Sequence, residues 1–321
     1  MKRTGLLSIC VSLALLLPGC GWFGGDTAVK EPQDYPVEAG GVTLSAPPER
    51  VLVLSPSLAE VAADMGFSGR LCGRSEECDA PQEVAALPSA GRMQLPDKGA
   101  VTGLEADLVL TQSPLSDTAS ALFEELKIPV AVIPAAVSFA DMEEMYRQVG
   151  RLFAGEQTGT LKGGAALQEL KGRLAAVAER VSPFLPEERP AALYAADIVG
   201  SAATGDTVAQ TVLHAAGLAN GAQEGTGWVL PEGAAAAAQW IFCPVGQEEA
   251  VISAALYANS PAVQNGRVIG VDAALFERQG WRLSQAALLM AKTVYPEAFA
   301  DGGTDEPAPE EEAPSDEAPT E

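Results

Sequence analysis

Few residues of this chain could carry covalent chemistry. His214 is the only histidine, and its apolar neighbours in residues 212–216 predict a structural place within a helix. The cysteines lack the CxxC spacing of a zinc site, and the polar segment 201–207 has neither of the glycine patterns that bind phosphates. The sequence therefore predicts no catalytic residue, no metal site and no resident cofactor, and it favours a binding protein over an enzyme.

Three arginines and a tryptophan are the candidates for non-covalent binding. Arg92, Arg278 and Arg282 could form charge-assisted, bidentate hydrogen bonds with the carboxylates or phenolates of an anionic ligand. Trp281 could stack on a planar ligand. Salt bridges within the protein for the arginines, and ordinary packing for the tryptophan, are the alternatives.

The balance of charge narrows the class of partner. The 321 residues include 43 Asp and Glu against 20 Lys and Arg, a formal net charge of −23. Nucleic acids are bound through clusters of Lys and Arg, so this balance argues against a nucleic-acid partner. Nine of the acids fall in residues 301–321, together with four prolines and no basic residue. Such a composition predicts a disordered acidic tail.

The first twenty residues have the features of a bacterial export signal. Lys2 and Arg3 precede an apolar run over residues 6–17, which is too short to span a bilayer comfortably. Residues 17–20, Leu-Pro-Gly-Cys, resemble a lipobox, in which the cysteine bears lipid and becomes the new N-terminus after cleavage. We expect Cys20 to anchor the protein to a membrane on its extracytoplasmic side, because several acyl chains bind firmly without a transmembrane helix. An ordinary signal peptide with an incidental cysteine is the alternative.

Export also bears on the other cysteines of the mature chain, which are Cys72, Cys78 and Cys243. An oxidising location would allow Cys72 and Cys78 to close a short loop. Because three is an odd number, at least one thiol stays free or pairs with another chain.

Along the body of the chain, apolar runs typical of buried strands alternate with segments whose apolar residues have the spacing of a helix. Residues 50–54 predict a buried strand, and the apolar positions of residues 58–65 repeat at three and four, as in a helix. Ser57 with Glu60 predicts a capping box for this helix, and Gly66 its end. Strands and helices in alternation predict parallel βαβ units and hence two α/β lobes. Further strands are expected at 108–111, 130–133, 192–195, 240–243 and 268–271, and helices at 118–126, 207–216, 248–257 and 283–294.

A long helical stretch separates the two predicted lobes. Ser138 is expected to cap a helix whose apolar residues share one face, and residues 167–181 keep a strict spacing of three and four up to Pro183. A single helix of about 24 residues would be about 36 Å long and could join the lobes as a rigid backbone.

Six segments, taken in order, resemble the class III substrate-binding proteins of ABC importers for iron complexes and cobalamin. They are residues 50–60, 72–74, 78–81, 103–110, 260–268 and 275–282. The similarity covers residues 42–298 with the expected spacing. It implies two Rossmann-like lobes with parallel sheets joined by a single long backbone helix. It also implies a ligand between the lobes, which in this class is heme, a ferric siderophore or a corrinoid.

The resemblance implies roles for particular residues in ligand binding. Met93 matches a methionine that ligates heme iron in some relatives, and Trp228 matches a tryptophan that contacts cobalamin. Phe276 and Arg278 belong to a segment whose arginine contacts the ligand. Two aromatic residues that flank the corrin ring in the cobalamin binder are absent here, because Glu77 and Met93 stand at their positions.

The resemblance also implies contacts with a permease. Glu232 matches a surface glutamate of the C-terminal lobe that docks on permease arginines. The matching position of the N-terminal lobe holds Gly99, and Asp97 is the carboxylate nearest to it.

Together these observations predict a substrate-binding lipoprotein of an ABC importer, which captures a ferric siderophore, heme or corrinoid and delivers it to the permease. Its partners would be the permease and ATPase subunits, the small ligand and the membrane, and the protein itself would be a monomer. A ligand-sensing or adhesion lipoprotein without transport is the alternative. The expected segments are a signal peptide at 1–19, a tether at 20–41, an N-terminal lobe at 42–137, a helical connector at 138–182, a C-terminal lobe at 183–300 and the acidic tail at 301–321.

The lipobox generates a direct test. Replacing Cys20 with Ser removes the thiol that would receive diacylglycerol, so Cys20→Ser cells fed radiolabelled palmitate should yield no labelled protein. Cys10→Ser changes a cysteine within the signal and is the matched control, which should label like the natural chain. Labelling of the Cys20→Ser protein would show that the lipobox assignment is wrong.

Overall fold

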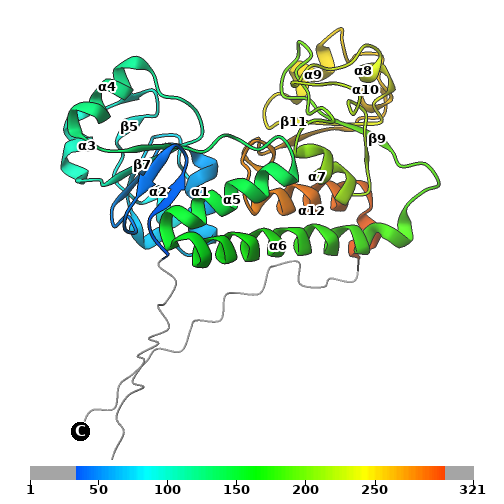
Figure 1. Ribbon diagram of the computed structural model, residues 1–321. Coiled ribbons are helices and arrows are strands. Elements are labelled where there is room, and N and C mark those ends of the chain that lie inside the picture. Colours follow the sequence, from blue (N-terminus) through cyan, green and yellow to red (C-terminus); the bar gives the residue numbers. More distant parts are fainter. Residues whose placement is uncertain (1–33, 301–321) are drawn as a thin grey trace, which may run out of the picture. The chain divides into compact units, whose positions relative to one another are not determined.

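Two parallel sheets of four strands carry the fold (Figure 1). The computed structural model describes residues 34–300, and the predicted signal peptide, Cys20 and the acidic tail lie outside this range. We call the parts built on the first and second sheet the N-lobe and the C-lobe. The first sheet has the order β4-β3-β7-β8 and contains β3 (Val51–Val53), β4 (Leu71–Arg74), β7 (Leu108–Thr111) and β8 (Val130–Val132). The second has the order β10-β9-β11-β12 and contains β9 (Ala191–Tyr194), β10 (Ala219–Asn220), β11 (Trp240–Pro244) and β12 (Val268–Val271).

The central strands are apolar on both faces because each sheet is covered on both sides. All three residues of β3 and all four of β7 are buried. β3 pairs with β4 on one side and with β7 on the other, and Val51 lies opposite Leu108 in the β7 pairing. Continuous apolar runs are typical of parallel strands covered in this way. The parallel α/β fold predicted from the sequence is therefore confirmed.

Short helices and turns connect the strands within each lobe. The helices of the N-lobe are α1 (Pro56–Asp64), α2 (Gln82–Ala85), α3 (Lys98–Leu104) and α4 (Asp117–Leu126), with the 3₁₀ turn η1 (Ser68–Arg70). Those of the C-lobe are α7 (Ala209–Ala215), α8 (Ala234–Ala237), α9 (Glu248–Ser253), α10 (Pro261–Gln264), α11 (Ala274–Glu277) and α12 (Arg282–Val294). The 3₁₀ turns η2 (Ser182–Phe184) and η3 (Pro296–Phe299) end the long helix and the last helix.

A pair of longer helices lies between the two sheets in the chain. α5 (Phe139–Ala154) begins with the predicted cap, because the Ser138 side chain accepts from the Asp141 N–H within a complete capping box. α6 (Glu156–Val181) has 26 residues, so it is about 39 Å long. It contacts α5 near its start and α12 and α7 further along (Figure 1). The long connecting helix that the sequence predicts is confirmed.

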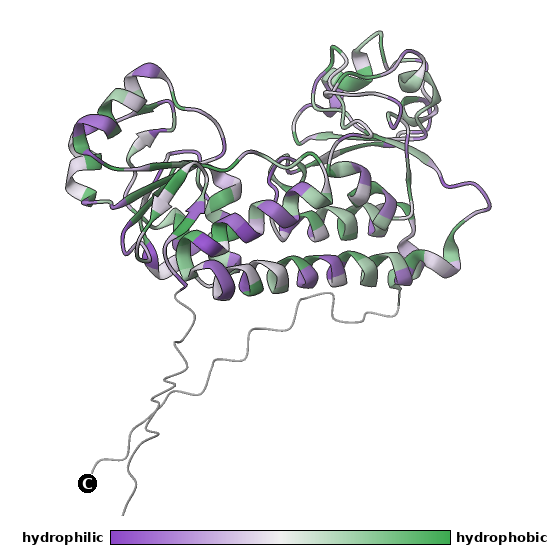
Figure 2. Cartoon of the chain, viewed as in Figure 1, coloured by the Kyte–Doolittle hydropathy of each residue, from purple (hydrophilic) through white to green (hydrophobic). Residues whose placement is uncertain are grey.

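The contact between α5 and α6 brings their backbones together. An added Cβ at Gly150 of α5 would overlap the carbonyl oxygen of Gly159, and one at Gly159 of α6 would overlap the carbonyl oxygen of Gly150. Gly163 approaches the carbonyl oxygen of Tyr146 in the same way. Beyond these glycines, α6 buries an apolar stripe and exposes hydrophilic residues on its other side (Figure 2). Together with the lobes, these helices form one compact unit that starts at Asp34.

The capping box predicted from Ser57 and Glu60 is wrong. α1 begins at Pro56, and its N-cap residue, Ser55, makes no side-chain capping hydrogen bond. Ser57 and Glu60 are buried instead, and their side chains bind residues of the C-lobe. The expected end of the helix is confirmed, because Gly66 follows α1 with φ +77°.

Two short antiparallel pairs of strands are not predicted from the sequence. β1 (Val37–Ala39) and β2 (Val42–Leu44) form a hairpin that packs on α5, and β1 lies within the segment that the sequence predicts as tether. β5 (Gly91–Arg92) pairs with β6 (Leu95–Pro96). Strands of two or three residues are too short for an alternating pattern to identify them.

The cysteines form no disulfide in the described part of the chain. Cys72, Cys78 and Cys243 are all free thiols, so the loop that Cys72 and Cys78 could close is open. Burial raises the pKa of the Cys243 thiol to about 11. Within residues 34–300 no helix is both long and apolar enough to cross a membrane.

Candidate functional site

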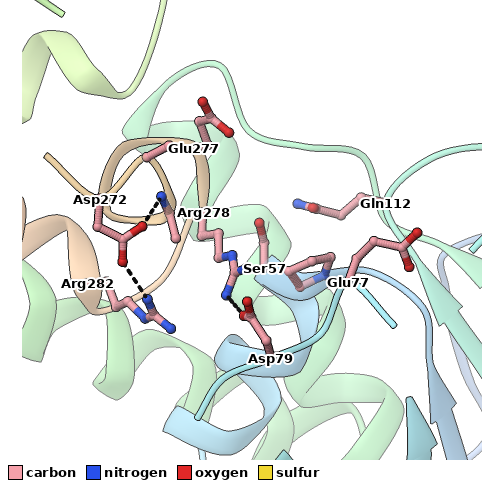
Figure 3. Close-up of a pocket in the computed structure, with 11 residues that line it drawn as sticks. Ser57, Glu77, Asp79, Gln112, Asp272, Glu277, Arg278 and Arg282 are labelled. Carbon is pink, nitrogen blue, oxygen red and sulfur yellow. Dashed lines mark hydrogen bonds and ion pairs between the residues drawn. The ribbon is translucent and has the colours of Figure 1, made fainter. Parts of the chain in front are cut away.

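A cavity of about 620 Å³ lies between the two lobes. Its N-lobe wall follows the carboxyl ends of β3, β4 and β7, and its C-lobe wall follows the carboxyl end of β12. Parallel sheets bind ligands at this end of their strands, so the topology positions the site. The lining residues are Pro56, Ser57, Glu77, Asp79 and Gln112 from the N-lobe, and Asp272, Ala273, Ala274, Glu277, Arg278 and Arg282 from the C-lobe (Figure 3).

Next to the two arginines of this cavity, a buried carboxylate joins the lobes. The side chain of Glu60 in α1 is 0% exposed, and its two oxygens lie 3.0 Å from a terminal guanidinium nitrogen of Arg278 and 3.3 Å from Nε of Arg282. Asp79 contacts Arg278 at 2.5 Å, and Asp272 lies 3.8 Å from Arg282. We call these five residues the inter-lobe clamp. Two arginines of the C-lobe are thus held by two carboxylates of the N-lobe and one of their own.

Burial and charge act in opposite directions on the clamp. Desolvation raises the pKa of Glu60, and the hydrogen bond and charge of Arg278 with the charge of Arg282 counter part of that rise. The hydrogen bond from Arg278 lowers the pKa of the more exposed Asp79. One oxygen of Glu60 accepts a hydrogen bond from Arg278, whereas the oxygen 3.3 Å from Arg282 makes an ion-pair contact without a hydrogen bond. Attraction to the two guanidinium groups offsets part of the cost of removing this charge from water. Each clamp guanidinium therefore has carboxylate partners before any ligand arrives.

Gln279 adds neutral hydrogen bonds between the lobes. Its side-chain amide is paired with the backbone of Ala136, donating through Nε2 to the carbonyl oxygen and accepting the N–H at Oε1, 2.7 Å away. The Gln112 amide also donates to Gln279 Oε1, at 3.3 Å. The backbone N–H of Gln279 donates to the Ser57 hydroxyl, at 3.3 Å. One residue between α11 and α12 thus reaches three segments that follow strands of the N-lobe.

Of the residues predicted to bind ligand, only Arg278 and Arg282 line the cavity. Phe276 is buried and stacks on Tyr194, with ring centroids 4.3 Å apart. Trp228 meets the same tyrosine edge to face at 6.3 Å. Its backbone is in the left-handed region, at φ +66°, which is rare for a bulky side chain. These rings form an aromatic cluster behind the wall.

The Tyr194 hydroxyl links this aromatic cluster to the cavity. It donates to a carboxylate oxygen of Glu277 at 3.3 Å. Burial and the Glu277 charge raise the pKa of Tyr194, so the phenol keeps its proton and remains a donor.

The other three predicted ligand-binding residues lie outside the lining. Arg92 is 74% exposed and 3.7 Å from Glu77. The Met93 sulfur accepts from the hydroxyls of Ser55 and Thr111, each at 3.6 Å, so it points into the N-lobe. The ring of Trp281 lies 5.9 Å below the Arg173 guanidinium of α6 and packs against that helix.

The two residues predicted to dock on a permease are both exposed. Glu232 precedes α8 on the surface of the C-lobe. Asp97 is the N-cap residue of α3, where its carboxylate accepts the N–H of Ala100 at 2.7 Å. Its charge is therefore engaged at a helix end.

Several residues that line or adjoin the cavity were not predicted from the sequence. Glu60 was assigned to a capping box because Ser57 stands three residues earlier, yet a glutamate inside an otherwise apolar helix face is itself a signal of a buried partner. Asp79, Gln112, Asp272 and Glu277 follow strand ends, and that position could have identified them. Gln279 carried no local signal. Among the described residues no group of three or more His, Cys, Asp and Glu could hold a metal ion.

The two lobes, their connecting helix and the polar cavity at the strand ends define a two-lobed ligand-binding protein. The chain belongs to the periplasmic binding protein family, whose model matches residues 51–275.

Individual relatives agree with this assignment. The chain is 25% identical over 317 residues to YvrC of Bacillus subtilis, an uncharacterized ABC transporter substrate-binding lipoprotein, covering 94% of this chain and 99% of that protein. It is 31% identical over 162 residues to the cobalamin-binding protein of Halobacterium salinarum, 48% of this chain and 41% of that one. A periplasmic heme-binding protein from Pseudomonas aeruginosa superposes with a TM-score of 0.64 at 21% identity, over 78% of this chain and 93% of that chain. The last comparison speaks for the fold alone.

The hydrogen bonds of Gln279 generate a stability prediction. Gln279→Ala should lower the free energy of unfolding by about 2 to 3 kcal/mol, because the buried N–H and C=O of Ala136 lose their partners. Gln285→Ala, on the exposed side of α12, is the control and should change it by less than about 0.5 kcal/mol. Urea unfolding followed by circular dichroism measures both. Equal stability of the two variants would contradict the assignment.

Proposed function

We propose that this protein is the lipid-anchored binding component of an ABC importer, which captures a metal chelate or a corrinoid between its lobes and delivers it to the permease. The observation that carries the proposal is the 620 Å³ polar cavity at the carboxyl ends of parallel strands from both lobes. A cavity of this size suits a ligand much larger than an amino acid or a simple sugar. The family and the named relatives support the same class of function.

The proposed function needs no covalent chemistry at the site. The polar groups that line it are carboxylates, guanidinium groups, an amide and the Ser57 hydroxyl. That hydroxyl accepts a hydrogen bond from the Gln279 backbone, and no histidine or lysine is among the lining residues to act as its base. Binding and release are what these groups can perform.

In this function the protein would need a membrane anchor and a docking surface for the permease. Cys20 would carry lipid and hold the protein on the outer side of a membrane, as a monomer, and residues 20–41 would include the tether. Glu232 on the C-lobe would meet the permease, with Asp97 as the nearest N-lobe carboxylate. The permease and its ATPase subunits would be the partners.

A second function is favoured by one observation. The carboxylate of Asp97 already caps α3, and the position expected for a docking glutamate is Gly99. A ligand-sensing or adhesion lipoprotein on this fold would need no N-lobe docking charge.

Ligand binding is tested by thermal denaturation with cyanocobalamin, heme and ferric siderophores. A ligand at a hundred times its Kd adds about 2.7 kcal/mol to stability, which should raise the Tm by several degrees. Ala273→Trp fills the cavity and should abolish the shift, whereas Ala176→Trp on the exposed side of α6 should retain it. If no compound of the three classes changes the Tm, the proposed function is wrong.

Docking is tested by ATPase stimulation of the reconstituted importer. Glu232→Ala should raise the protein concentration that gives half-maximal stimulation about tenfold, because a docking charge is lost. Asp97→Ser keeps a helix cap but removes the charge, and it should have a similar effect if the N-lobe docks. Glu188→Ala, an exposed carboxylate between η2 and β9, is the control. Absence of stimulation by the natural protein with its ligand would favour the sensor.

A further inference from the structure

The two arginines in the cavity are already neutralised by the protein. Arg278 binds Asp79 and Glu60, and both arginines share Glu60. Both guanidinium side chains are 15% exposed, so little of either charge faces the space between the lobes. Even with a proton on Glu60, Asp79 and Asp272 would balance the two positive charges. The arginines are therefore poor binding sites for an anionic ligand.

Two carboxylates that line the cavity, Glu77 and Glu277, form no ion pair with Arg278 or Arg282. Glu277 accepts a hydrogen bond from the neutral Tyr194 hydroxyl, and no ion pair of Glu277 is found within residues 34–300. Glu77 accepts from the Met93 N–H at 3.3 Å, and its one cationic partner in the described part of the chain is the exposed Arg92, 3.7 Å away. Figure 3 shows both carboxylates apart from the two guanidinium groups, on opposite sides of the cavity.

The cavity consequently has an excess of negative charge. Four carboxylates and two guanidinium groups line it, and Glu60 lies directly behind the arginines. A concave site with an excess of one sign of charge attracts ligands of the opposite sign and repels those of its own sign. A ligand that covers Glu77 and Glu277 without offering hydrogen-bond donors would also leave them desolvated and unpaired, which is costly.

We propose that the cavity selects its ligand by charge and takes a chelate that is neutral or positively charged, with amide or ammonium donors directed at Glu77 and Glu277. This inference rests on the proposed function and narrows its ligand class. A corrinoid with primary amides around its ring fits this chemistry, as does a linear ferric trihydroxamate with a terminal ammonium. Heme, whose two propionates are negative, does not fit it.

Two series of compounds test the inference. Within each series the metal core stays the same, and the three members are positive, neutral and negative. The first is a linear ferric trihydroxamate with a free terminal amine, its neutral N-acetyl derivative and its negative N-succinyl derivative. The second is aquocobalamin, cyanocobalamin and a monocarboxylate of cyanocobalamin. Calorimetric titration of the natural protein should give an affinity that falls roughly fivefold for each step toward negative charge, in whichever series binds. The positive member should also lose affinity as salt rises.

Variants of the two carboxylates connect this order to the cavity. Glu77→Gln with Glu277→Gln should reduce the charge preference to less than about twofold while a neutral member of the series still binds. Glu187→Gln with Glu188→Gln removes the same charge from exposed positions between η2 and β9 and should leave the preference unchanged.

The outcomes separate the charge rule from the proposed function. Binding of the negative member as tightly as the positive one, or binding of heme in preference to every neutral and positive probe, would overturn the charge rule and leave the function intact. A cavity that binds no member of either series and no heme would overturn the function and the charge rule with it. An equal change of preference in the two double variants would also overturn the rule, because the effect would then come from bulk charge.

Discussion

The arrangement of this protein depends on one buried carboxylate. Glu60 is removed from water and is surrounded by the guanidinium groups of two residues that lie more than 200 positions away in the chain. A charge in such a place is strongly unfavourable without its partners, so it disfavours separation of the lobes while it is ionised. Gln279 adds hydrogen bonds that are independent of ionisation. The relative position of the walls, and hence the shape of the cavity, follows from these contacts.

The same contacts determine what the cavity can recognise. The guanidinium groups that hold the two lobes together interact only weakly with a ligand, because each guanidinium can donate hydrogen bonds in a limited set of directions. The groups left for recognition are those at the edges, Glu77 and Glu277, and the aromatic cluster behind Glu277 keeps one of them in place through a phenol that remains protonated. The residues that hold the lobes together and one of those proposed to select the ligand therefore share one short segment, residues 277–282, from the end of α11 to the start of α12.

The local pattern of apolar residues in the sequence predicts most of the helices and strands, but it does not predict which side chains meet at the cavity. The continuous apolar runs and the spacing of three and four predict β3, β7, α5 and α6 closely, because those patterns reflect burial along a single element. Arg278 and Arg282 were identified as cavity residues from chemistry and resemblance, but their partners were not, because Glu60 and Asp79 are far away in sequence. Met93 and Trp281 show the same limit: each has the right chemistry for a ligand, but Met93 turns toward the interior of the N-lobe and Trp281 toward α6. The direction of a side chain depends on tertiary packing, which a single sequence does not encode locally.

The contact of α5 with α6 at Gly150, Gly159 and Gly163 has a consequence for how this protein can change over evolutionary time. The backbones of the two helices are in direct contact, so a single methyl group at any of these positions would push the helices apart. Because α6 also contacts α7 and α12 of the C-lobe, a tilt of this helix, which is about 39 Å long, would move the C-lobe as well. The loops at the strand ends can therefore change in evolution and alter ligand choice, whereas these three glycines, which do not line the cavity, cannot be replaced without moving the helices.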